Sequence, residues 1–141
     1  MMVVFTDEES KIEKVLKESK NIAVIGITKD PKKPGNYVPQ VLKEKGFRLF
    51  GVNPKYAGEE IMGIKVFRSI NEIPEDIDVV LVFRPPQDLP KIVNEAYAKG
   101  FKTFWMQPGT TNEEVKGELA KRGYNVVAER CIKIESERYI K

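Results

Sequence analysis

The stretch NIAVIGITKDPKKPGNYVP, residues 21–39, is typical of a buried strand that runs into a lysine-rich loop and then into a helix. Residues 22–27 are almost wholly apolar, as expected of a central parallel strand that is covered on both faces. Gly26 marks the point where the backbone leaves the sheet. A helix that starts near Asn36 would direct its unpaired N–H groups and its positive dipole end into the loop. The pattern therefore predicts a site suited to phosphate.

The rest of the chain alternates between strand-like and helix-like apolar patterns. A first helix over residues 7–19 has Thr6 or Asp7 as its expected N-cap. The helix that starts near Asn36 has Pro39 in its first turn, where a missing N–H costs nothing, and it stops at Gly46. Further strands are expected over residues 48–52, 78–83, 102–106 and 124–128, with a short edge strand within 54–67 and helices over 89–99 and 113–121.

This alternation predicts a single α/β domain over residues 1–141. Successive parallel strands are joined by right-handed crossovers, which place helices on both faces of the sheet. We therefore expect a three-layer sandwich with a mostly parallel central sheet of five to six strands. The helix within residues 1–20 is expected to pack on this domain.

The composition excludes several kinds of chemistry. The chain has no histidine and one cysteine. Catalysis by Ser-His-Asp or Cys-His groups, a histidine metal ligand and a phosphohistidine are therefore impossible, and neither a metal site nor an internal disulfide is expected. The net charge of +3 is mild, and lysines and glutamates are interspersed, which argues against nucleic-acid binding.

The composition also bears on the protein's surroundings. No apolar run approaches the ~20 residues of a membrane span, so no membrane association is expected. The single cysteine suits a reducing compartment, and the two observations together predict a cytoplasmic protein. Abundant lysine and glutamate without histidine favour a thermophilic source.

The carboxyl ends of the predicted strands are polar, basic and proline-rich, and in a parallel sheet such ends form the ligand site. A nicotinamide dinucleotide site usually needs G-x-G-x-x-G there, and an acidic residue after the second strand. Gly26 has no glycine two or five positions later, and Asn53-Pro54-Lys55 stands where the acid would be. The missing glycines disfavour an NAD(P)-binding redox or regulatory domain, which remains an alternative.

Short motifs follow one another in a specific order and spacing over about residues 15–137. They are Ile25-Gly26-Ile27-Thr28, Pro31 to Pro34, Val52-Asn53-Pro54-Lys55-Tyr56, residues 63–67, Val82-Phe83-Arg84, Trp105-Met106-Gln107, and Arg130-Cys131-Ile132-Lys133. In this order they resemble the CoA-binding domain family, the Rossmann-like module also found at the N-terminus of the succinyl-CoA synthetase alpha subunit. The similarity is closer to the small stand-alone CoA-binding proteins of bacteria and archaea.

This resemblance implies coenzyme A as the ligand. The loop Gly26-Ile27-Thr28-Lys29 would hold the CoA pyrophosphate through backbone N–H groups and the Thr28 hydroxyl, beside Lys33 and Pro34. Lys55, after Asn53 and Pro54, would pair with a CoA phosphate. Phe83, Arg84 and Pro85 would flank the adenine or the start of the pantetheine arm, and Met106 and Gln107 would lie along that arm. Which of Lys29, Lys32 and Lys33 takes the 3′-phosphate stays open.

Cys131 is the one candidate for covalent chemistry. A lone cysteine is most often a small buried apolar residue, but Arg130 and Lys133 would raise its reactivity as a thiolate. The main hypothesis is a non-catalytic protein that binds CoA or an acyl-CoA as a carrier, sensor or partner. The alternative is an enzyme of CoA thiol or acyl chemistry with Cys131 as nucleophile. Whether the chain has a protein partner or forms a homo-oligomer stays open.

Overall fold

A computed structural model describes the backbone of residues 4–141 and the side chains from residue 11 onward. Seven strands form one sheet in the order β3-β4-β2-β1-β5-β6-β7. All neighbouring strands pair in parallel except β3 and β4, which are antiparallel. The strands are β1 (Asn21–Ile25), β2 (Arg48–Val52), β3 (Glu60–Ile61), β4 (Ile64–Phe67), β5 (Val79–Val82), β6 (Thr103–Met106) and β7 (Asn125–Ala128).

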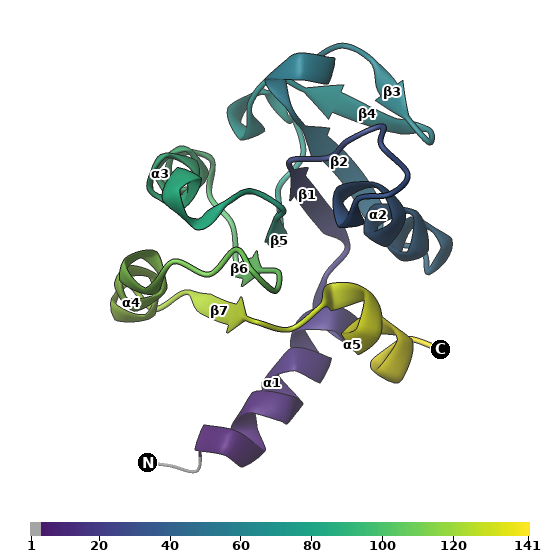
Figure 1. The fold of residues 1–141 in the computed structure, drawn as a ribbon. Helices are drawn as coiled ribbons and strands as arrows, with labels where there is room; N and C mark the ends of the chain where they lie inside the picture. Colours follow the sequence, from purple (N-terminus) through teal and green to yellow (C-terminus); the bar gives the residue numbers. More distant parts are fainter. Residues whose placement is uncertain (1–3) are drawn as a thin grey trace.

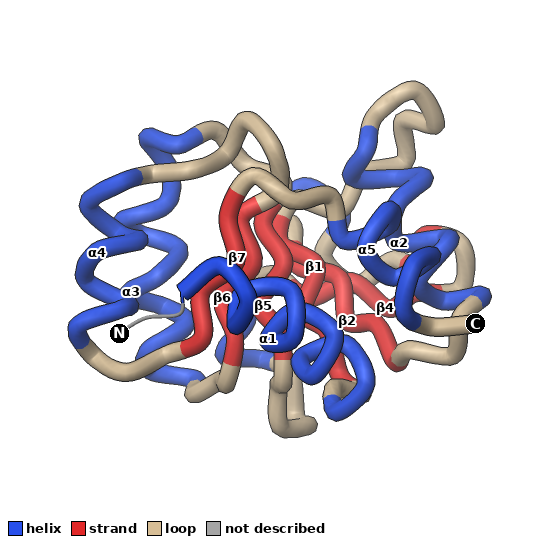
Figure 2. Tube along the Cα trace, turned by 90° about the horizontal axis from the view of Figure 1, so that it is seen from below, coloured by secondary structure: helices blue, strands red, loops and turns tan. Residues whose placement is uncertain are grey.

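Helices cover both faces of this sheet, as Figures 1 and 2 show. The helices α1, α2 and α5 pack on one face, and α3 and α4 pack on the other. They are α1 (Val4–Glu18), α2 (Pro34–Glu44), α3 (Leu89–Lys99), α4 (Glu113–Lys121) and α5 (Ile132–Tyr139), and the short 3₁₀ turns are η1 (Pro54–Tyr56), η2 (Ile70–Glu72) and η3 (Pro86–Asp88). The predicted Rossmann-like, three-layer α/β fold is confirmed.

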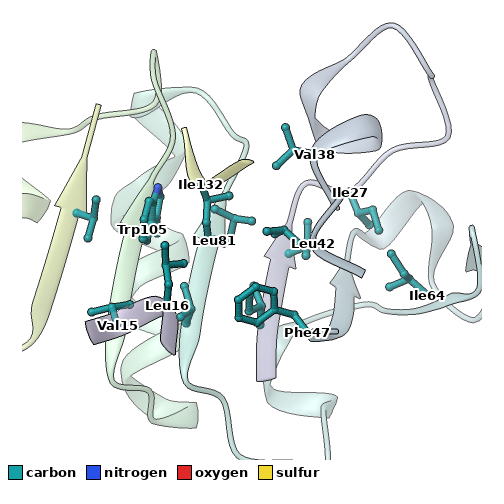
Figure 3. Packing of buried hydrophobic residues seen from close by; sticks show 14 of the residues in the cluster. Val15, Leu16, Ile27, Val38, Leu42, Phe47, Ile64, Leu81, Trp105 and Ile132 are labelled. Atoms are coloured by element: carbon teal, nitrogen blue, oxygen red, sulfur yellow. The ribbon is translucent and has the colours of Figure 1, made fainter. Parts of the chain in front are cut away.

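The central strands are buried because each face of the sheet has its own apolar core. On the first face, Leu16 from α1, Leu42 from α2 and Ile132 from α5 meet the strand residues Leu81 and Trp105 (Figure 3). The second core joins the apolar side chains of α3 and α4 to those of η2 and of the alternate strand positions. Helix α1 contributes Ile12, Val15 and Leu16 to the first core, and it also contacts α5.

Several element boundaries differ from those expected. Helix α1 includes Thr6 and Asp7, which therefore do not cap it. Helix α2 begins at Pro34 rather than near Asn36, so Pro39 lies inside the helix instead of in its first turn. The excursion over residues 54–67 forms two short strands rather than one, which brings the sheet to seven strands.

The final helix, α5, was not predicted from the sequence. Its sequence shows only weak apolar periodicity, since the buried positions include the polar Glu135 and Ser136 while the apolar Ile134 is exposed. Within the described chain, no helix combines the length and apolar character needed to cross a membrane.

Candidate functional site

A cavity of about 480 Å³ opens at the carboxyl ends of β1, β2, β5 and β6. Three cationic side chains line it, and none of its lining residues is acidic. This charge balance suits a ligand with several negative charges. The lining residues are Gly26, Thr28, Lys33, Pro34, Gly35, Tyr37, Val38, Asn53, Lys55, Tyr56, Phe83, Arg84, Gln107, Pro108, Thr110 and Cys131.

The loop after β1 is held against the first turn of α2. Gly26 turns the chain with φ +93°, a conformation that favours glycine. The Thr28 N–H then donates to the Gly35 carbonyl at 3.3 Å, and the Asn36 amide donates to the Thr28 carbonyl at 2.8 Å. The Gly35 oxygen is free to accept because Pro39, four residues later, has no N–H to offer it.

This arrangement leaves α2 with an accessible positive end. Lys33 is the N-cap and makes no side-chain capping bond, while the N–H groups of Asn36 and Tyr37 donate to the Lys33 carbonyl. Among the described residues, none accepts a hydrogen bond from the Gly35 N–H. Since Gly35 lines the cavity, its N–H and the helix dipole can meet an anion there.

Asn53 joins the loops that follow β1 and β2. Its amide nitrogen donates to the Ile27 carbonyl at 2.8 Å, and its amide oxygen accepts the Lys55 N–H at 3.0 Å. The second bond caps η1 and fixes the backbone that carries Lys55. Asn53 therefore positions a cation beside the cavity, in addition to lining it.

Tyr56 lies between two lysines at the rim. The ammonium groups of Lys29 and Lys55 are each 5.4 Å from the centroid of its ring. A hydrogen bond with the Thr28 hydroxyl, and then the charge of Lys55, hold the pKa of Tyr56 below its ordinary value. Lys29 forms an ion pair with Glu59, so its charge is partly neutralised.

Cys131 also lines the first cavity, and it immediately precedes α5 as its N-cap. Gln107, which is 4% exposed, accepts the Ile132 N–H at 2.8 Å, and its amide nitrogen lies 3.5 Å from the Cys131 sulfur. The indole N–H of Trp105 donates to the Arg130 carbonyl at 2.7 Å. These bonds fix the cysteine in the wall of the cavity.

The cations next to Cys131 in the sequence are paired with carboxylates. Arg130 lies 3.5 Å from Glu135, and Lys133 lies 3.4 Å from Glu137. Within the described residues, no three acidic or cysteine side chains gather closely enough to hold a metal ion.

A second cavity, of about 920 Å³, lies at the carboxyl ends of β1, β2, β4 and β5, next to α3. It shares Gly26, Asn53, Lys55 and Arg84 with the first cavity, so these residues separate the two. Arg84 is held in this wall by Asp88, whose carboxylate accepts from Nε at 3.1 Å and from Nη2 at 2.8 Å. The remaining lining residues are Ile25, Val52, Pro54, Arg68, Ser69, Gln87, Asp88, Lys91, Ile92 and Glu95.

The structure brings together ten of the residues predicted for cofactor binding, and Cys131 with them. The first or second cavity is lined by Gly26, Thr28, Lys33, Pro34, Asn53, Pro54, Lys55, Phe83, Arg84 and Gln107. Lys29 and Pro85 line neither cavity.

Ile27 and Met106 do not offer their side chains to either cavity. Both are fully buried, Ile27 in the core under α2 and Met106 in the core under α3 and α4. Side chains alternate between the faces of a strand, so Gln107 reaches the first cavity and Met106 does not. The side-chain contact with the pantetheine arm that was predicted for Met106 therefore does not fit its place in the core. Ile27 was predicted to act through its backbone N–H, and that role stays a prediction.

The sequence interpretation left out several lining residues of the first cavity, namely Gly35, Tyr37, Val38, Tyr56, Pro108 and Thr110. Tyr37, which lies in α2, is 42% exposed. Gly35 carried a usable signal, because a glycine in a first helical turn often permits a close backbone approach. For the lining residues of the second cavity that lie outside the predicted motifs, no sequence feature indicated a place in the site.

The strand topology and the site at the strand ends define a Rossmann-like ligand-binding module. A family model described as "CoA binding domain" matches residues 20–137. The chain therefore belongs to the CoA-binding domain family.

Known proteins of two kinds are similar to this chain. The uncharacterized protein YneT of Bacillus subtilis is 33% identical over 126 residues, which cover 89% of this chain and 92% of YneT. The ADP-forming acetate–CoA ligase of Methanocaldococcus jannaschii is 32% identical over 130 residues, which cover 86% of this chain but only 18% of the ligase. A solved structure of a hypothetical protein from Pyrococcus horikoshii has a TM-score of 0.89 and 35% identity, over 94% of this chain and 92% of that one.

Proposed function

We propose that this protein binds coenzyme A or an acyl-CoA at the carboxyl ends of its parallel strands, and that it acts as a non-catalytic carrier, sensor or partner protein. The observation that carries the proposal is the first cavity, where Lys33, Lys55 and Arg84 face no acidic lining residue. A pyrophosphate is the kind of ligand that this cavity suits. Membership in the CoA-binding domain family supports CoA as the particular ligand.

The two cavities suggest how the ligand lies. The pyrophosphate would meet the Gly35 N–H in the first cavity and the loop that begins at Gly26, a residue that lines both cavities. The pantetheine arm would follow the first cavity past Phe83 and Gln107 toward Cys131. The adenosine end would enter the second cavity, where Ile25, Val52 and Ile92 offer apolar surface. The single cysteine suits a cytoplasmic setting.

The proposal is tested by identifying and then weakening the bound ligand. Denaturing the purified protein and analysing the released small molecules by mass spectrometry should yield CoA or an acyl-CoA. Calorimetry should then show that Lys55→Glu weakens CoA binding at least about tenfold, because it reverses a charge at the wall that both cavities share. The matched control is Lys65→Glu on β4, outside both cavities. Equal affinity in the two variants would refute this placement.

A second candidate function is thiol chemistry at Cys131, favoured because its sulfur lines the same cavity and receives the Gln107 amide at 3.5 Å. With CoA disulfide as the oxidant, the Cys131 thiolate would attack one sulfur. A protein–CoA disulfide would form, and the second CoA would leave as a thiolate that takes up a proton. Mass spectrometry without reductant would detect the adduct. In Cys131→Ser the adduct should vanish while CoA binding persists, and absence of the adduct in the wild type would rule out this candidate.

A further inference from the structure

The second cavity carries an excess of positive charge. Lys55, Arg68, Arg84 and Lys91 line it, against the carboxylates of Asp88 and Glu95. Asp88 is already engaged by Arg84 at 2.8 Å. Among the side chains described from residue 11 onward, no carboxylate lies within 4.0 Å of the charged groups of Lys55, Arg68 or Lys91. These three charges are thus available to an anionic ligand.

A hydroxyl lies next to one of these cations. Ser69 lines the cavity and precedes η2 as its N-cap, yet it makes no side-chain capping bond. The carboxylate of Glu72 accepts the Arg68 N–H at 3.2 Å and is not among the lining residues. The cavity therefore combines a guanidinium, an ammonium and a free hydroxyl, which are the donors that phosphate monoesters prefer in proteins.

We propose that Arg68 and Lys91, with the Ser69 hydroxyl, bind the 3′-phosphate of the CoA ribose. This inference rests on the proposed function. It implies that the protein distinguishes CoA from dephospho-CoA, which lacks the 3′-phosphate. If the pyrophosphate of CoA lies at Gly26 and Gly35 and the thiol end lies in the first cavity, the adenosine end extends into the second cavity. A monoester phosphate there carries nearly two negative charges, and none of the described carboxylates lies within 4.0 Å of the charged groups of Arg68 or Lys91.

The test is a cycle of two ligands and two protein variants, measured by calorimetry. Wild-type protein should bind CoA at least about tenfold more tightly than dephospho-CoA, which lacks only the 3′-phosphate. In the double variant Arg68→Gln/Lys91→Gln this ratio should fall to about threefold or less, while the affinity for dephospho-CoA changes little. The control Arg48→Gln/Lys65→Gln removes the same two kinds of charge outside both cavities and should retain the ratio.

The outcomes separate this inference from the function on which it rests. If wild-type protein binds neither ligand, the proposed function and the inference both fail. If it binds both equally, CoA binding stands and the phosphate site is refuted. If it prefers CoA but the double variant keeps that preference, another cation, such as Lys32 or Lys33, takes the phosphate and the assignment is wrong. Since all four substituted side chains are exposed, thermal melts should show that every variant folds.

Discussion

Gly35 in the first turn of α2 packs directly on the carbonyl oxygen of Gly26, so that a β-carbon added to Gly35 would lie 2.8 Å from that oxygen. Real β-carbons do not approach a backbone oxygen so closely, and neither partner is the end of a flexible side chain. The loop that turns out of β1 and the helix that follows are therefore in contact through their backbones. This contact places the positive end of α2 next to the first cavity.

Gly35→Ala should consequently damage both stability and binding. The methyl group must push α2 away from the loop, at a cost of about 1–3 kcal/mol in the free energy of unfolding. The same displacement breaks the 3.3 Å bond from Thr28 to the Gly35 carbonyl, so CoA affinity should fall at least about tenfold. Urea denaturation and calorimetry measure the two effects.

Gly117 provides the matched control for this substitution. It lies within α4, and a β-carbon added there would meet no atom within 4 Å. Gly117→Ala should therefore stabilise the protein by about 0.4–1 kcal/mol and leave CoA affinity unchanged. If Gly35→Ala behaves like Gly117→Ala, the close packing of Gly35 has no role in the site.

The parts of the site that were predictable are those dictated by one strand and its exit. The apolar run of residues 22–27 and the turn at Gly26 predicted β1 and the loop that follows it, because such a run is typical of a buried parallel strand. The basic ends of β2 and β5 then placed Lys55 and Arg84. These features depend on local sequence and on the topology of parallel sheets.

The remainder depends on contacts that no local pattern reveals. Pro39 was expected in a first turn because its missing N–H is costly elsewhere, but the freed Gly35 carbonyl is satisfied by Thr28 from another segment. The second cavity brings Arg68 and Lys91 together from sequence positions that show no common motif. The sequence also does not show on which face of β6 the Met106 side chain lies, because that depends on the register in which β6 pairs with β5.

Asp78 predicts how stability responds to acid. Burial raises the pKa of its carboxyl, but the N–H groups of Asn21 and Lys20, at 3.0 and 2.9 Å, together with the charge of Lys102, hold it below the ordinary value of 3.8. A lowered pKa in the folded state contributes stability above the unfolded pKa, and this contribution is lost as pH falls through the folded value. Asp78→Asn should cost about 1–3 kcal/mol at pH 7.

The difference between Asp78→Asn and the wild type should shrink as pH falls from about 5 to about 2, because only the wild type loses this contribution. Urea denaturation at a series of pH values measures the two free energies. A difference that stays constant over that range would show that the carboxyl does not titrate with folding.

Tyr97 predicts the response to alkali. Burial, and then the neighbouring Glu118 carboxylate, raise the pKa of Tyr97 to about 12 from an ordinary value of 10.0. A raised folded pKa contributes stability below the unfolded value, and this stability is lost as pH rises through the folded value. Wild-type stability should therefore fall between about pH 10 and pH 12 more steeply than that of Tyr97→Phe.

Phe101→Leu is the control for this comparison. It removes a ring stacked on Tyr97, with centroids 6.1 Å apart, but no titrating group. We expect it to lower stability by a similar amount at every pH, so that its curve runs parallel to that of the wild type. Parallel curves for Tyr97→Phe as well would contradict the assignment of the alkaline step to Tyr97.

Glu59 sets how much positive charge the rim of the first cavity offers. Its carboxylate forms an ion pair with Lys29, and that lysine also lies 5.4 Å from the ring centroid of Tyr56. Both partners of the pair are about half exposed, so solvent screens the interaction. Lys29 lines neither cavity while it is paired, although it belongs to the loop that leads to Lys33 and the start of α2.

Glu59→Gln should strengthen CoA binding, because it releases the charge of Lys29 in the loop after β1, where we propose that the pyrophosphate binds. We expect a gain of about two- to fivefold at low ionic strength that largely disappears at about 0.5 M salt, since exposed charges are screened. Calorimetry at both salt concentrations measures it. Glu114→Gln on α4 changes the net charge equally but lies away from both cavities, and it should leave the affinity unchanged. An equal gain in both variants would mean that net charge, rather than the release of Lys29, governs the effect.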